Sequence, residues 1–170
     1  LVMGRVAGLL RAQRETVARE RTLRITGADL VAVSSEKEAA GVLRKAIADL
    51  VPTGQPYAVH MYGSDATAGE PTGMRPMRRV AVADLPAEVA EKLAGQETAL
   101  VADLISPGRV SGGPTRRKSV SLAAPDHVLL MLEQSFQALM TQAIMAVERI
   151  TLTDEVNRRS SEDYFRALIQ

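Results

Sequence analysis

The residues that could do chemistry in this chain are few, and they begin with its two histidines, His60 and His127. An imidazole is the commonest metal ligand in proteins and also an axial ligand for haem iron. A metal site needs further ligands, however, and no spacing of His, Asp or Glu provides them. There is no cysteine, which excludes disulfides, thiolate metal sites and cysteine nucleophiles. We therefore predict no catalytic residue, no metal site and no enzymatic activity in this chain, and the sequence identifies no cofactor.

His60 is the better placed histidine, because it lies in a stretch with alternating side-chain character. Residues 57–62 predict a strand in which Val59 and Met61 face one way. If those two face a helical core, His60 and Tyr62 face the other side of the sheet. Two interpretations stay open at this point. The pair binds a small ligand on the sheet face, or His60 is a structural histidine.

A second polar candidate is the basic segment Arg116-Arg117-Lys118, which follows a stretch rich in Gly and Pro. Guanidinium groups and exposed backbone N–H groups can hold a phosphate. No Gly-Lys-Ser/Thr opens a helix here, so the segment is no P-loop. We expect a solvated loop.

The elements that must position these residues form an α+β pattern. Helical periodicity covers residues 5–34 and 35–50, with Ser35 as N-cap and Glu38 at the capping-box position of the second helix. Further elements follow: strands at 57–62, 77–83, 98–105 and 119–124, a short helix at 84–93, and a long helix at 126–159. This order predicts an antiparallel sheet with helices on one face and long N- and C-terminal helices.

The last helix carries a wide apolar face. Five of its residues recur at helical spacing: Leu132, Phe136, Leu139, Ala143 and Ile150. One side of such a face can pack on a sheet while the other pairs with a second copy of the helix. We therefore predict a homodimer with these five residues in its seam. The polar run at 157–161 predicts the end of this helix.

Composition excludes several function classes. The 170 residues carry a net charge of +1 and only 3% aromatic residues, without tryptophan, so a nucleic-acid partner is not expected. No apolar run is long enough to span a bilayer, and Arg5 interrupts the apolar first residues, which do not resemble a signal peptide. The chain begins on Leu1, so we expect an excerpt of a longer, cytoplasmic protein, or the cytoplasmic part of a membrane-anchored one.

Three stretches together resemble a GAF domain, the sensory module of bacterial signalling proteins. Residues 21–50 resemble its opening helices, residues 139–149 its closing helix, and residues 158–170 the junction to a following PAS-like or output domain. The resemblance implies a signalling or linker helix at 1–34, a GAF-like domain at 35–159, and the start of a linker or next domain at 160–170. It implies a regulatory role in signal transduction, with a small ligand on the sheet face.

The sequence also departs from this family. The Asn-Lys…Phe…Asp-Glu signature of cyclic-nucleotide-binding members is missing, and bilin-attaching and methionine-sulfoxide-reducing members need cysteines. A sensory or dimerising role survives. The layout is similar to cyclic-di-GMP turnover proteins with GGDEF and EAL domains, and to sensor histidine kinases, so a downstream output domain in the same protein is the expected partner. The alternative is a degenerate GAF-like spacer that only dimerises, without a ligand.

Overall fold

Four strands form one antiparallel sheet, whose strand order is β1-β4-β3-β2. The computed structural model of the chain describes residues 2–65, 77–93, 95–105 and 116–168. In chain order the elements are α1 (Val2–Ala32), α2 (Glu36–Leu50), β1 (Ala58–Asp65), β2 (Arg78–Ala81), the 3-10 turn η1 (Val82–Asp84), α3 (Ala87–Lys92), β3 (Thr98–Ile105), β4 (Arg116–Ala123) and α4 (Asp126–Leu168).

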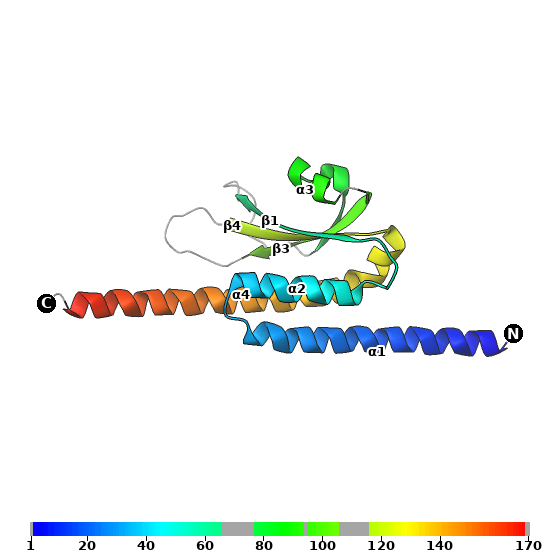
Figure 1. The fold of residues 1–170 in the computed structure, drawn as a ribbon, viewed down its shortest axis with the longest axis horizontal. Coiled ribbons are helices and arrows are strands. Elements are labelled where there is room, and N and C mark those ends of the chain that lie inside the picture. The colour runs from blue at the N-terminus through cyan, green and yellow to red at the C-terminus, as the bar shows by residue number, and fades with distance from the viewer. Residues whose placement is uncertain (1, 66–76, 94, 106–115, 169–170) are drawn as a thin grey trace.

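The long helices lie on one side of the sheet, which confirms the predicted α+β fold class. Figure 1 shows α2 and α4 beneath the strands and α1 as a further layer beneath these two helices. The short α3 lies on the opposite face of the sheet, above one end of the strands. We refer to the face under α2 and α4 as the inner face and to the face under α3 as the outer face.

The sheet is apolar on both faces because each face has its own cover. On the inner face, Leu100, Val120 and Leu122 join the main core with α2 and α4. On the outer face, Val101 and Ala123 join a smaller cluster with residues of η1 and α3. β3 therefore has apolar side chains on both faces, whereas the sequence analysis expected helices on one face only. Its observed bounds match the predicted ones.

The five predicted seam residues of α4 lie inside this chain's own core. Each side chain is at most 5% exposed, and all five pack in the main core cluster. Their helical spacing identified a buried face correctly. That face is covered by the sheet and by α1 and α2, however, so a contact between two copies has to use other residues of α4.

α4 does not end at the predicted break. It continues through residues 157–161 as far as Leu168, so the predicted domain boundary at 159/160 lies inside a continuous helix. The reason is local pairing across the polar run. Arg158 forms ion pairs with Glu155 at 3.0 Å and with Glu162 at 2.8 Å, at the three- and four-residue spacings that stabilise helices.

Two strands are longer than their sequences predicted. β1 continues to Asp65, and β4 begins at Arg116, because the two strands pair along residues 63–65 and 116–118. The basic segment is therefore part of a strand and not a solvated loop. β2 is shorter than predicted and ends at Ala81, where η1 begins.

Ser35 caps α2 as predicted. Its hydroxyl oxygen accepts a hydrogen bond from the Glu38 N–H at 3.2 Å. The Glu38 carboxylate, however, accepts from the backbone N–H of Ser34 at 2.8 Å, one residue earlier than in a capping box. This bond is the largest cause that lowers the pKa of Glu38 below its ordinary value.

The Glu38 contact predicts a pH dependence. Because the pKa of Glu38 is lowered in the folded chain, its stabilising effect is present above its unfolded pKa and is lost as the pH falls through the folded value. Glu38→Gln should therefore flatten the rise of unfolding free energy with pH in the acidic range, measured by urea titrations followed by circular dichroism. Glu91→Gln, which removes an exposed carboxylate of α3, is the control and should keep the parent slope. Equal slopes in all three proteins would contradict the prediction.

Candidate functional site

The outer face carries the pair that the sequence singled out. Val59 and Met61 pack against the main core, whereas Tyr62 packs against the outer cluster, so the alternation of β1 is as expected. The rings of His60 and Tyr62 stack with centroids 6.0 Å apart and planes inclined by 10°. Both side chains are half-buried. The structure therefore brings the two predicted residues together on one face.

Three polar residues that the sequence analysis missed lie beside this pair. In the register of the sheet, His60 is opposite Ser121, Tyr62 is opposite Ser119, and Ser119 is opposite Asp103. The Ser119 hydroxyl donates to the Asp103 carboxylate at 2.6 Å. The Ser121 hydroxyl is fully buried and has no hydrogen-bond partner among the described residues. Polar side chains thus cross three adjacent strands.

These polar residues and the pair beside them, which we call the polar strip, do not form a catalytic relay. A nucleophile needs a base within hydrogen-bond reach and a third group that orients the base. Within the described segments no hydrogen bond joins His60 to Ser121, and Asp103 bonds to Ser119 instead. Ser121 is also inaccessible to a substrate. What the strip offers is hydrogen-bonding capacity next to a stacked aromatic pair.

The described residues hold no cluster of three or more potential metal ligands. His127 lies exposed in the first turn of α4. No group of three potential ligands in the described residues includes it or His60.

A second notable region is the junction between the two long helices. The Arg149 guanidinium of α4 donates to the carbonyl oxygens of Leu30 at 3.2 Å and Val33 at 2.7 Å. A helix leaves its last four carbonyls without intrahelical partners, and α1 has no basic residue in its own last turn. α4 thus provides the C-terminal cap of α1 from across the interface.

The same junction includes a close approach at Gly27. A Cβ atom there would lie 3.4 Å from the side-chain amide of Gln142, so glycine leaves room for that amide. The buried Oε1 of Gln142 has no hydrogen-bond partner within the described part of the chain. Thr26, directly before Gly27, and Leu30, about one turn after it, are buried. The contact between α1 and α4 is therefore tight and partly polar.

Beyond this junction the two helices extend past the sheet in opposite directions (Figure 1). On α4 the large exposed apolar side chains are Leu130, Met145, Leu152, Val156, Tyr164 and Phe165, each between 60% and 67% exposed, and the last four lie beyond Arg149. On α1, Val17 is 61% exposed. Met145, Leu152 and Val156 are seven and four residues apart, which places them on one face of α4. We call these three residues the α4 stripe.

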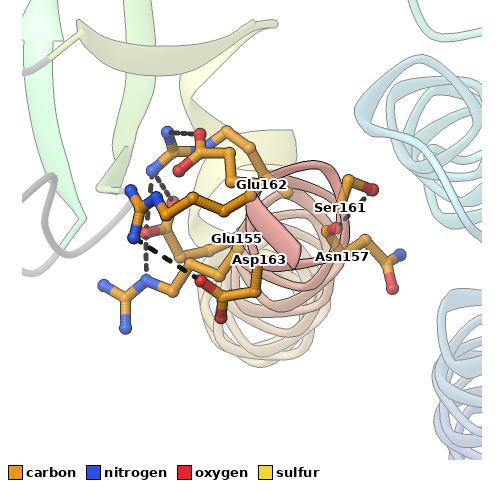
Figure 2. A network of polar contacts seen from close by, with 8 residues as sticks. Glu155, Asn157, Ser161, Glu162 and Asp163 are labelled. Atoms are coloured by element: carbon orange, nitrogen blue, oxygen red, sulfur yellow. Dashed lines mark hydrogen bonds and ion pairs between the residues drawn. The ribbon is translucent and has the colours of Figure 1, made fainter. Parts of the chain in front are cut away.

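The free part of α4 is reinforced by ion pairs. Figure 2 shows Glu155, Glu162 and Asp163 on one side of the helix, while Ser161 bonds to the Asn157 carbonyl on another side. Glu155 and Glu162 pair with Arg158, Glu155 also pairs with Arg159, and Asp163 pairs with Arg166. The hydrogen bond from Arg158 is the largest cause that lowers the pKa of Glu155. These pairs are exposed, so each contributes modestly to helix stability.

A search for helices that could cross a bilayer finds none among the described residues, judged by length and hydropathy.

Comparisons with known proteins add no relative. No protein-family model matches the chain, and neither a curated protein nor a solved structure matches it.

The Arg149 contact predicts a measurable stabilisation. In Arg149→Met, the carbonyls of Leu30 and Val33 lose their donor, and we expect the unfolding free energy to fall by about 1–3 kcal/mol. The measurement is a urea titration followed by circular dichroism.

The matched control is Arg166→Met, which removes an arginine from the exposed end of the same helix. It should change the unfolding free energy by less than about 0.5 kcal/mol. Similar values for the two variants would show that the cap of α1 contributes nothing specific.

Proposed function

We propose that this chain is a regulatory domain that dimerises through the free ends of its long helices and relays a change in their packing. The observation that carries the proposal is the construction of α1 and α4. Both helices are uninterrupted, the Arg149 cap joins them, and α4 exposes an apolar stripe on the side away from its buried core residues. A long helix with one side buried against its own domain and a second apolar stripe in water is suited to pair with another copy.

The part of α4 beyond Ile150, the last residue of this helix in the main core, supports the same conclusion. A helical segment without tertiary contacts is only marginally stable in water, even when ion pairs assist it. Pairing of the α4 stripe with its counterpart in a second copy would bury Leu152 and Val156 and supply the missing tertiary contacts. Tyr164 and Phe165 extend the apolar surface toward the end of α4.

The relay follows from the coupling of the layers. α4 contacts β3, α2 and α1, so a shift of the sheet relative to the helices changes the position of α4. Arg149 then transfers that shift to the end of α1. A signal biases such an equilibrium only if it favours one of two arrangements of the helices.

The resemblance to GAF domains supplies the biological context of the proposal. It rests on the helix-packing residues at 21–50 and 139–149. In this context the domain acts in the cytoplasm of a bacterium, and the output domain is a GGDEF/EAL protein's catalytic region or a histidine kinase. The proposal assigns no catalysis to the chain itself.

The dimer is tested by adding charge to the α4 stripe. We expect the parent chain to sediment as a dimer and Leu152→Glu/Val156→Glu to sediment as a monomer, because two carboxylates would have to be buried without partners. Circular dichroism should show unchanged folding, since both side chains are exposed in one copy.

The control is Asn157→Glu/Ser161→Glu, which adds the same charge at exposed polar positions on another side of the same helix. It should remain a dimer. A monomeric parent chain, or equal association of the two variants, would refute pairing through the stripe.

A small polar ligand on the outer face is the second part of the proposal. The observation that favours it is the stacked pair of His60 and Tyr62, both half-buried, beside the hydrogen-bonded Ser119 and Asp103. Aromatic rings next to a carboxylate can contact a ligand that carries both apolar and polar groups.

This second part is tested by thermal unfolding in the presence of nucleotides, amino acids and haem. A ligand at about a hundred times its Kd should add roughly 2.7 kcal/mol to the unfolding free energy. That gain should vanish in His60→Ala/Tyr62→Ala and persist in His127→Ala, which changes only an exposed histidine. If nothing stabilises a chain that is dimeric, the spacer without ligand is the better description.

A further inference from the structure

A cavity of about 400 Å³ lies between the first turns of α2 and the sheet. From α2 it is bordered by Ala39, Ala40 and Leu43, and from α4 by Val147. The strands contribute residues near the ends that lie away from α3, on β1, β3 and β4. The cavity thus meets the main core on the inner face, and of the candidate residues singled out from the sequence it borders Tyr62 and Lys118.

The floor of the cavity is apolar. Leu43, Leu104 and Val120 border it and are among the buried residues of the main core. Small side chains leave the space open, because Ala39 and Ala40 face it from α2 and Gly63 from β1. An apolar hollow of this size is within the range of small-molecule sites.

The mouth of the cavity has the opposite character. Lys37 and Lys118 border it together with Glu36, and Glu36 is ion-paired with Lys118. Lys37 has no ion-pair partner in the described part of the chain. The cavity also borders the first residues of α2, whose leading N–H groups have no intrahelical acceptor. Uncompensated positive charge therefore lies at the edge of an apolar hollow.

We propose that this cavity binds an amphipathic carboxylate, with an unbranched apolar tail along Leu43, Leu104 and Val120 and the carboxylate at Lys37. The volume fits a tail of medium length. A water molecule takes about 30 Å³ in the liquid, so the cavity has room for roughly a dozen groups of comparable size, as in decanoate. The binding does not depend on the proposed dimer, because it uses no residue of the α4 stripe. Tyr62 borders the cavity as well as the outer face, whereas His60 does not border it, so His60→Ala alone separates the two sites.

The experiment is isothermal titration calorimetry of the 170-residue chain with hexanoate, octanoate and decanoate. Each buried methylene should tighten binding about fourfold. Decanol tests the head group with the same tail and should bind about twofold to fivefold more weakly, because it lacks the charge interaction with Lys37. Decylamine, whose head group is positive, should bind more weakly than decanol.

Variants locate the site. Ala40→Leu fills the hollow and should weaken decanoate binding about tenfold or more, whereas Ala48→Leu, on an exposed position of α2, should leave it unchanged. Lys37→Gln should remove the preference for decanoate over decanol, and Lys45→Gln should keep it. Melting curves of each variant establish that it folds.

Four results would overturn the inference. The first three are the absence of a heat of binding with decanoate at millimolar concentration, equal affinity of Ala40→Leu and the parent for decanoate, and equal affinity of the parent for decanoate and decylamine. The fourth concerns His60. His60→Ala should bind decanoate as the parent does. If His60→Ala alone abolished binding, the tail would lie on the outer face and not in this cavity. Loss of the dimer in the stripe variant leaves this result unaffected, so the two proposals fail separately.

Discussion

The structure depends on the burial of the wide apolar face of α4. Phe136 and Leu139 lie at the centre of the main core, where α4 meets the inner face of the sheet, and the same helix packs against α1 and α2. Without α4 the inner face of the sheet would be open to water, and α1 would lose the donor that caps its end. Burial of this many large side chains outweighs the low intrinsic stability of a long helix. The outer cluster under α3 is smaller and secures only one end of the sheet.

Local patterns in the sequence predicted most of the fold. The strand Thr98–Ile105 and the cap Ser35 were identified at their observed positions, since a short apolar run and a helix cap are properties of a few neighbouring residues. The predicted helix end at 157–161 was wrong, because a polar run is compatible both with the end of a helix and with an exposed helix. In the structure the run stays helical, and Arg158 pairs with carboxylates on both sides of it.

The remaining errors come from contacts between distant parts of the chain. Periodicity showed that Leu139 and its neighbours are buried, but it does not say whether a sheet or a second copy covers them. The basic segment became a strand because β1 continues far enough to pair with it. The polar strip on the outer face could not be predicted from the sequence for the same reason. Ser121 and Asp103 are far from His60 in sequence, and only the strand register places them together. The cavity beneath α2 likewise arises from small residues on separate elements.

The uninterrupted helix α4 also fixes the angle, about the helix axis, between its core side chains and the exposed side chains near its end. Because one rigid helix runs from the centre of the core to Leu168, the direction of each exposed side chain is set by its distance in sequence from Phe136. Each residue advances this direction by about 100°, so removing one residue from the free segment would turn everything beyond it by more than a quarter circle. Removing seven would turn it by only about 20°. The number of residues in the part of α4 beyond the core therefore sets the direction in which the side chains at its end point. Evolution can lengthen or shorten it in steps of seven while the surfaces at its two ends keep their relative orientation.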